Sequence, residues 1–310
     1  MLTKKLFTSV ATVSLSLGCL AFQSVYAADA PANGAQTTEF LTTDFLSTLK
    51  PDQGAIKALP EKIRNKKVLT IGGETTLAPY LFRQDGKITG IEADFMQALE
   101  KVLDVKINVI NTGFSSMIIG LLSGRVDVAM SDFSDTVARE EQVDFVDYTK
   151  TGQMLVVAKG NPLKIHSLAD LCGHIAAGPT GSLSVQLAEQ QSATCLTEGK
   201  KAVDVKKYPS GADTYLALGN GRVDTSGIDY AIAAHQVKAS NGKLELAGEL
   251  FAKGFHGAAL PKDNPQLRDA LLKAFQSIYE QGAAEKILAK WGVSQMLMTG
   301  PGINATAAQK

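Results

Sequence analysis

Three short motifs place hydroxyl, arginine and carboxylate groups directly after predicted strands, where the sheet of an α/β protein usually meets its ligand. The first motif follows a strand at 126–130 and contains Ser134, Thr136 and Arg139. An arginine can bind a carboxylate through two parallel charge-assisted hydrogen bonds, and the hydroxyls add further donors. The same residues could instead cap a helix and leave the arginine in solvent, so both interpretations stay open.

The other two motifs lie in the later part of the chain. Thr180, Gly181 and Ser182 stand where a strand becomes a helix, and the free N–H groups of a helix start favour an anion. Asp229 ends another strand, where its carboxylate can hold an ammonium group. The alternatives are a plain turn at 178–182 and a helix cap at Asp229. Together the motifs supply the polar partners of an α-amino acid.

Several kinds of chemistry find no support. The chain has no GxSxG, P-loop or HExxH motif, and we find no nucleophile–base pair. Its four histidines show no metal-ligand spacing, so we expect ordinary surface or edge residues at His166, His174, His235 and His256. We therefore predict no catalytic residue, no cofactor and no metal. Basic and acidic residues are equal at 31 each, which argues against a nucleic-acid partner.

The length of 310 residues, 45% of them hydrophobic, suffices for two domains with a substantial core. Residues 1–27 begin with two lysines, are apolar over 6–22 and end in small residues, which predicts a secretory signal peptide cleaved after Ala27. The alternative, a membrane anchor, would need a longer stretch with fewer hydroxyl residues. We do not expect a lipoprotein, because Ser16 stands where the lipobox before Cys19 normally has Leu. We expect the exported chain in the periplasm.

Export bears on whether the two cysteines that remain after signal cleavage form a disulfide. Cys172 and Cys195 form an even pair in an oxidising compartment, which favours a disulfide over two buried thiols. They enclose a loop of a couple of dozen residues, and closing it would stabilise the fold by roughly 3 kcal/mol in the chain-entropy picture.

Short apolar strands alternate with amphipathic helices, which is the pattern of an α/β protein with a largely parallel sheet. Residues 28–57 show little periodicity and suggest a tether or a loosely packed arm. Strands are expected at 68–71, 105–110, 126–130, 154–158, 174–177, 203–208, 223–228, 244–246 and 257–260. Helices are expected at 91–103, 115–122, 167–171, 183–191, 212–218, 229–239, 265–278 and 282–291.

From about Leu59 to Val293 the chain resembles the family 3 solute-binding proteins of ABC importers for polar amino acids. The resemblance rests on stretches such as TGFSSMIIGLLSGRVDVAMSDFSDTVAREEQVDFVDYTKTG, SLADLCGHIAAGPTGS and GRVDTSGIDYAIAA, found in that order. It implies the type II periplasmic-binding-protein fold, in which two crossover strands join two α/β lobes that hold a ligand between them. The implied parts are a signal peptide at 1–27, an N-terminal extension at 28–59, lobe one at 60–157 and 255–295, lobe two at 161–248, hinges near 157–161 and 249–255, and a C-terminal tail at 296–310.

The resemblance also implies roles for single residues. By resemblance, the ligand carboxylate is bound by Arg139, Ser134, Thr136, Ser182, Gly181 and Thr180. The ligand ammonium is bound by Asp229, with Asp132 beside it. Glu74, Leu77, Tyr80 and Phe114 fall in the pocket for the ligand side chain, and Cys172 with Cys195 matches a disulfide of some members.

Two departures from the family pattern bear on the ligand. Asp132 stands where Gly or Ser is usual, and Leu77 stands where many members have a stacking aromatic residue. An extra acid near Glu74 favours a cationic group, and like-charge proximity raises the pKa of one carboxylate. We therefore expect a basic or polar amino acid as ligand.

Three functions follow from the resemblance. The leading one is a monomeric binding protein whose lobes close on an amino acid and then dock on an ABC transporter permease in the inner membrane. The second is an enzyme like the exported cyclohexadienyl or arogenate dehydratases, with Glu74 or Asp132 as general acid. The third is a ligand-sensing protein that docks on a separate receptor.

Overall fold

A sheet of nine strands runs through the computed structural model, which describes residues 38–306. The predicted signal peptide and residues 28–37 of the predicted extension lie outside the described residues. The strand order is β5-β1-β6-β11-β7-β10-β8-β9, and β12 also pairs with β7. These strands are β1 (Val68–Gly73), β5 (Lys106–Asn111), β6 (Val128–Ala129), β7 (Val143–Ala158), β8 (Ile175–Pro179), β9 (Asp204–Tyr208), β10 (Thr225–Asp229), β11 (Leu244–Pro261) and β12 (Gly302–Ile303). A separate three-stranded sheet contains β2 (Thr76–Leu77), β3 (Leu81–Gln84) and β4 (Lys87–Thr89).

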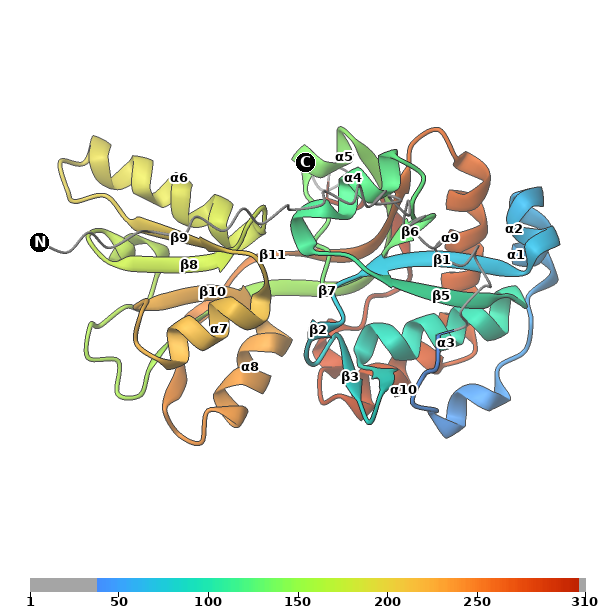
Figure 1. Ribbon diagram of the computed structural model, residues 1–310, viewed down its shortest axis with the longest axis horizontal. Coiled ribbons are helices and arrows are strands. Elements are labelled where there is room, and N and C mark those ends of the chain that lie inside the picture. The colour runs from blue at the N-terminus through green and yellow to red at the C-terminus, as the bar shows by residue number, and fades with distance from the viewer. Residues whose placement is uncertain (1–37, 307–310) are drawn as a thin grey trace, which may run out of the picture. The chain divides into compact units, whose positions relative to one another are not determined.

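The two longest strands, β7 and β11, pair antiparallel and pass through both halves of the main sheet, as Figure 1 shows. Parallel strands β5, β1 and β6 make up one half. Strand β10 pairs antiparallel with β7 and continues into the parallel strands β8 and β9 of the other half. Two α/β lobes joined by two crossover strands are the type II fold, which confirms the predicted fold class. The lobe boundaries and hinge ranges stay a prediction.

The long strands differ from the three shorter ones expected at 154–158, 244–246 and 257–260. The first part of β7 carries acids and hydroxyls that interrupt the apolar pattern, yet nearly all of its residues are buried between neighbouring strands. In β11 the pairing register shifts between Ala247 and Gly254, where Gly248 and Ala252 have left-handed φ values of 72° and 44°. This irregular stretch hides the continuity of β11 in the sequence.

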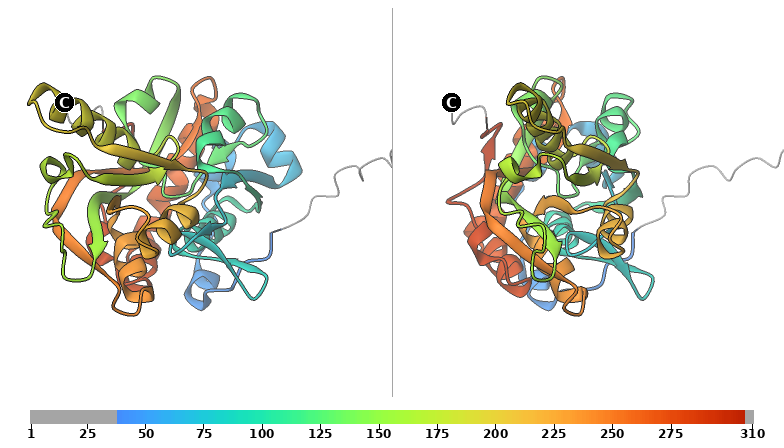
Figure 2. Two further views of the ribbon diagram at one scale, coloured as in Figure 1. Left: turned by 60° about the vertical axis from the view of Figure 1, so that its left-hand side comes forward. Right: turned by 90° about the vertical axis from the view of Figure 1, so that its left-hand side faces the viewer.

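Helices cover both faces of the sheet (Figures 1 and 2). In the half that contains β8 and β9, α6 lies on one face and α7 and α8 lie on the other. The predicted helices begin within a few residues of their expected starts. From residue 91 onward the helices are α3 (Ile91–Leu103), α4 (Met117–Leu122), α5 (Val137–Glu140), α6 (Leu183–Thr197), α7 (Gly211–Gly219), α8 (Tyr230–Ala239), α9 (Pro265–Glu280) and α10 (Ala283–Lys290), with 3-10 turns η2 (Phe114–Ser116), η3 (Leu168–Leu171) and η4 (Ser294–Met296). Polar N-caps precede α6, α7, α8 and α9, whereas glycine precedes α3 and α10.

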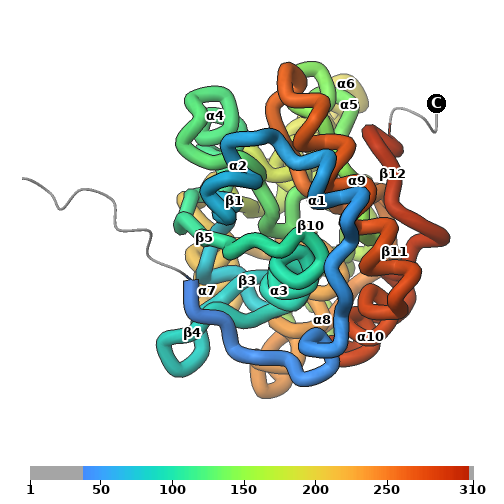
Figure 3. The backbone as a smooth tube through the Cα atoms, turned by 90° about the vertical axis from the view of Figure 1, so that its right-hand side faces the viewer, coloured from blue at the N-terminus to red at the C-terminus, as the bar shows by residue number. Residues whose placement is uncertain are grey.

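The described part of the N-terminal extension is packed, so the expectation of a loose arm is wrong there. It forms η1 (Asp44–Thr48) and α1 (Gln53–Ala58), followed by α2 (Glu61–Lys66). Figure 3 shows α1 beside α3 and α9. Leu46 and Ala55 are buried, and the Thr43 hydroxyl donates to Asp94 at 2.7 Å. The apolar residues that make this packing are few and far apart, so they form no periodic pattern in the sequence.

The predicted disulfide between Cys172 and Cys195 is present and joins the end of η3 to α6. Among residues 38–306, no helix is both long and apolar enough to cross a membrane.

Candidate functional site

A small cavity lies where the two lobes face each other. Its volume is about 40 Å³, which leaves room for only a few water molecules. Seven of the predicted site residues line it: Glu74, Leu77, Phe114, Asp132, Ser134, Ser182 and Asp229. The lining also includes Pro179, Gly227 and Ile228 from the motifs found in the sequence, and residues that the sequence did not indicate: Gln153, Leu183, Ser184, Gly211, Tyr215 and Ser226. Five predicted residues are not part of the lining: Thr136, Arg139, Thr180, Gly181 and Tyr80.

Arg139 forms the positive end of the site. Its guanidinium group is buried, donates to the Ser134 carbonyl at 2.6 Å, and reaches across the cleft to the Gly181 carbonyl at 3.0 Å. It also lies 4.5 Å from the centroid of the Phe133 ring, in cation–π contact. Burial lowers the pKa of Arg139 to about 10, so the group is still a cation at neutral pH. A ligand carboxylate could take the place of the Gly181 carbonyl.

Three of the predicted residues cap helices as well as flanking the cleft. Thr136 accepts from the Arg139 backbone N–H at the start of α5, and Ser182 accepts from the Val185 N–H at the start of α6. Asp229 caps α8 through the Ala231 N–H at 2.9 Å. The helix cap considered at Asp229 is therefore present, whereas the alternative of a solvent-exposed arginine is wrong, because Arg139 is buried. Capping and ligand contact are compatible for Ser182 and Asp229, because both also line the cavity.

Asp229 is held by hydrogen bonds from different parts of the chain. The Tyr80 hydroxyl donates to Oδ1 at 2.7 Å, and the Thr151 hydroxyl donates to Oδ2. Tyr80 is 1% exposed, does not line the cavity and positions Asp229. The hydroxyl of Tyr80 is turned to Asp229, and its place in the side-chain pocket stays a prediction.

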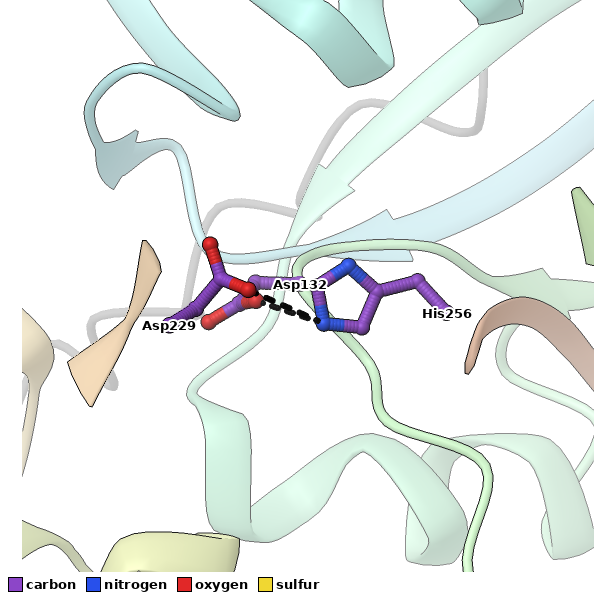
Figure 4. Close-up of side chains that lie close together, drawn as sticks. All are labelled: Asp132, Asp229 and His256. Carbon is purple, nitrogen blue, oxygen red and sulfur yellow. Dashed lines mark ion pairs between the residues drawn. The ribbon is translucent and has the colours of Figure 1, made fainter. Parts of the chain in front are cut away.

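Asp132 and Asp229 meet at His256, as Figure 4 shows. The His256 Nε2 atom lies 2.9 Å from Asp132 Oδ1 and 3.8 Å from Asp229 Oδ2. Burial would lower the pKa of His256, but the carboxylates of Asp132, Asp229 and Glu92 outweigh it and raise the pKa to about 8. Burial, with Asp229 and Glu92 nearby, raises the pKa of Asp132 to about 7 despite the opposing effect of His256.

His256 was expected to be a surface or edge residue, and that expectation is wrong. It lies in β11 with 0% exposure, and β11 pairs with β7 on one side. Its sequence neighbours Phe255 and Gly257 give no sign of this position, because the contacts with Asp132 and Asp229 come from distant parts of the chain. The pKa of Asp132 is raised as expected, but its main cause is burial, and the acids that add to the shift are Asp229 and Glu92 rather than Glu74.

A third carboxylate, Glu74, lies at the side-chain end of the cavity. Its Oε1 atom accepts from the Gly211 N–H at the start of α7 at 3.2 Å and from the Thr76 hydroxyl at 3.2 Å. Burial raises its pKa, although these hydrogen bonds oppose the shift. Leu77 and Tyr215 are the apolar and aromatic neighbours in this part of the lining. The pocket thus combines one acid with an apolar wall.

A two-lobed α/β body with a charged cavity between its lobes is the arrangement found in solute-binding proteins. The sequence matches the bacterial extracellular solute-binding proteins, family 3, over residues 69–294, and the chain belongs to this family.

Similar proteins bear names of amino-acid-binding proteins. An arginine-binding protein of Corynebacterium glutamicum is 28% identical over 77% of this chain and 79% of its own. An L-cystine-binding protein of Escherichia coli is 31% identical over 76% of this chain and 87% of its own. The structure of an ancestral arginine-binding protein bound to glutamine has a TM-score of 0.67 and 33% identity, and covers 73% of this chain and 98% of its own. The named relatives are thus binding proteins.

Proposed function

We propose that this chain is the substrate-binding protein of an ABC importer and binds a basic or polar amino acid between its lobes. The observation that carries the proposal is the charge order along the cleft: Arg139 at one end, Asp132 and Asp229 at another, and Glu74 beside the apolar wall. An α-amino acid has the matching order of carboxylate, ammonium and side chain. The family membership supports a periplasmic location after export and docking on a permease.

Ligand entry requires the lobes to separate. The cavity of about 40 Å³ cannot admit an amino acid while Arg139 and Gly181 are in contact across it. Hinge opening would free both groups, and closure would be stabilised by a ligand that contacts both lobes at once. Irregular pairing in β11 between Ala247 and Gly254 offers a place for the bend.

A thermal-shift screen of the ligand-stripped protein tests the proposal. The panel contains the proteinogenic amino acids with ornithine, citrulline and prephenate. A ligand that binds only the folded state raises the melting temperature, and we expect one basic or polar amino acid to do so. Arg139→Lys keeps the charge but loses the planar fork, and Arg139→Met keeps much of the packing on Phe133 without the charge.

We expect the shift to shrink in Arg139→Lys and to vanish in Arg139→Met, with each variant compared with its own ligand-free melting temperature. A full shift in Arg139→Met would contradict the assignment of Arg139. If only prephenate shifts the melting temperature and is also turned over, the chain is a dehydratase rather than a binding protein. If no compound in the panel binds, the amino-acid proposal fails.

A further inference from the structure

We propose that Asp132, Asp229 and His256 form a binding site for a divalent transition-metal ion of the Zn²⁺ class. The spacing of histidines in the sequence predicted no metal site, but the fold brings these three ligands together from three separate elements. Asp132 follows β6, Asp229 ends β10, and His256 lies in β11. Their ligand atoms all lie within 4.8 Å of one another (Figure 4).

The distances are compatible with a bound metal as well as with a hydrogen-bonded pair, since 2.9 Å is also an ordinary N–H···O distance. Tetrahedral Zn²⁺ with bonds of about 2.0–2.2 Å holds its ligand atoms about 3.3 Å apart. The Nε2 atom of His256 lies 2.9 Å from Asp132 Oδ1 and 3.8 Å from Asp229 Oδ2, on either side of that value. Yet neither Nε2 nor Asp132 Oδ1 has a hydrogen bond of good geometry to any described residue. A fully buried imidazole nitrogen thus points at two carboxylates without a satisfactory partner.

Asp229 has the outer-shell hydrogen bonds that a metal ligand needs, whereas the Nδ1 atom of His256 has no partner among the described residues. Ligating carboxylates are usually held by further hydrogen bonds, and here Tyr80 and Thr151 donate to Asp229. The backbone N–H of Asp132 donates to Glu92 at 3.0 Å, and Asp132 has a left-handed φ of 51°. The aspartate is therefore held in an unusual backbone conformation by a buried acid on α3.

The ligand types select the class of ion. One imidazole with two carboxylates suits Zn²⁺ and its neighbours in the first transition row, whereas Ca²⁺ and Mg²⁺ take oxygen ligands almost exclusively. Three protein ligands leave a coordination position open. Asp132 and Asp229 line the cavity, so this position faces the space between the lobes.

The proposed function gives Asp132 and Asp229 to the ligand ammonium, so Zn²⁺ and an amino acid would compete for these carboxylates. Zn²⁺ alone is the probe, with no amino acid present, so metal binding is measured separately from ligand binding. The exported chain is purified without a histidine tag and stripped of metal and ligand, and Zn²⁺ is titrated by calorimetry and by thermal shift. We expect one Zn²⁺ per chain and a rise in melting temperature that EDTA reverses. Co²⁺ in place of Zn²⁺ should give the visible absorption of a low-symmetry site.

Four variants decide whether these residues hold the ion. His256→Gln and Asp132→Asn should each lower the Zn²⁺ affinity by more than about 100-fold, and Tyr80→Phe, which removes an outer-shell partner, by about 10–100-fold. His166→Gln removes an exposed histidine and should leave the affinity unchanged. Two results overturn the site: no saturable binding in the unaltered chain, or binding that survives in both His256→Gln and Asp132→Asn. In that case His256 serves only as a buried cation beside Asp132.

Discussion

Asp229 accepts hydrogen bonds from three parts of the fold. Removing one donor hydroxyl measures what that hydrogen bond contributes to the free energy of unfolding. The Tyr80 hydroxyl is buried and lies 2.7 Å from Asp229 Oδ1. Tyr80→Phe leaves the ring in place and withdraws one donor from a buried carboxylate, which should cost about 1–3 kcal/mol in the free energy of unfolding. Urea denaturation measures it. The control is Tyr208→Phe, because the Tyr208 hydroxyl has no hydrogen bond to a described residue. Equal stability of the two variants would contradict the role given to Tyr80.

Glu74 is the residue on which the expectation of a basic ligand depends. Glu74→Gln removes the charge and keeps an oxygen that can accept from the Gly211 N–H. If the proposed function holds, a basic amino acid should bind about 10–100-fold more weakly, since a hydrogen bond to a charged group contributes about 1.5–3 kcal/mol. An uncharged polar amino acid should lose much less. Calorimetry with both kinds of ligand measures these affinities. An equal loss of affinity for both would show that Glu74 does not select for ligand charge.

The sequence identified the residues of the site better than it identified their contacts. Ser182 and Asp229 were found because each follows a strand, and strand ends in an α/β sheet converge on one edge, whereas Asp132 was found through the family resemblance. His256 was missed because it sits inside a strand, and only the folded sheet brings it to the two aspartates. The direction of the Tyr80 hydroxyl depends on packing across the lobes, which no local pattern records.

At the scale of elements, two buried acids beneath the C-terminal segment are expected to make stability depend on pH. Strand β12 pairs with β7, and after it the backbone N–H groups of Ala305 and Thr306 donate to Asp147 at 2.8 Å and to Asp135 at 3.1 Å, which by itself lowers the pKa of each acid. Burial, with Asp147 and Glu140 close by, raises the pKa of Asp135 to about 8. Burial also raises the pKa of Asp147 to about 6. Two acids under one segment therefore favour a protonated state.

A carboxyl whose pKa is raised on folding stabilises the folded state fully below its unfolded pKa of about 4, and this contribution is lost as pH rises through the folded pKa. The free energy of unfolding should therefore fall between pH 5 and pH 8, by up to about 1.4 kcal/mol per pH unit for each proton involved. Asp135→Asn cannot ionise and should flatten this slope. Urea denaturation at a series of pH values measures it. An unchanged slope in the variant would place the pH dependence elsewhere, for example at His256.

The disulfide between Cys172 and Cys195 acts on the unfolded chain of lobe two. The two cysteines are 23 residues apart, and closing such a loop stabilises by about 3 kcal/mol in the chain-entropy picture. The double variant Cys172→Ser/Cys195→Ser should lose about this free energy of unfolding. Reduction of the unaltered chain should lower its stability by a similar amount and leave the variant unaffected. A reductant effect that persists in the variant would point to another cause.

Helices proved easier to predict than long strands, for a physical reason. The apolar spacing of α3 is local and gives its bounds, Ile91–Leu103, directly. Strand β7 owes the burial of its acids to neighbours that are far away in sequence, and its polar first half does not look like a strand. The extension before α2 packs through a few residues such as Leu46 and Ala55, which are too sparse to form a pattern.

At the scale of the whole molecule, the proposed hinge motion must break contacts that now cross the cleft. Three of the hydrogen bonds among the described residues cross the cleft: Arg139 donates to Gly181 at 3.0 Å, Tyr80 to Asp229 at 2.7 Å, and the Gly211 N–H to Glu74 at 3.2 Å. Each involves a charged side chain, and such a hydrogen bond contributes about 1.5–3 kcal/mol, so opening of the cleft requires water to replace these partners. A bound ligand that contacts both lobes would add to them and shift the population toward the closed form.

Spin labels on the two lobes test this motion. Ile119 on α4 and Leu216 on α7 are 67% and 62% exposed, and both native cysteines of the described chain are held in the disulfide, so Ile119→Cys/Leu216→Cys can be labelled selectively. Pulsed electron paramagnetic resonance should give a broad distance distribution without ligand and a narrower one with ligand, because the ligand selects one arrangement of the lobes. Arg139→Met should keep the broad distribution at the same ligand concentration. An identical distribution with and without a ligand that binds would mean that the lobes do not move, and that ligand enters by another route.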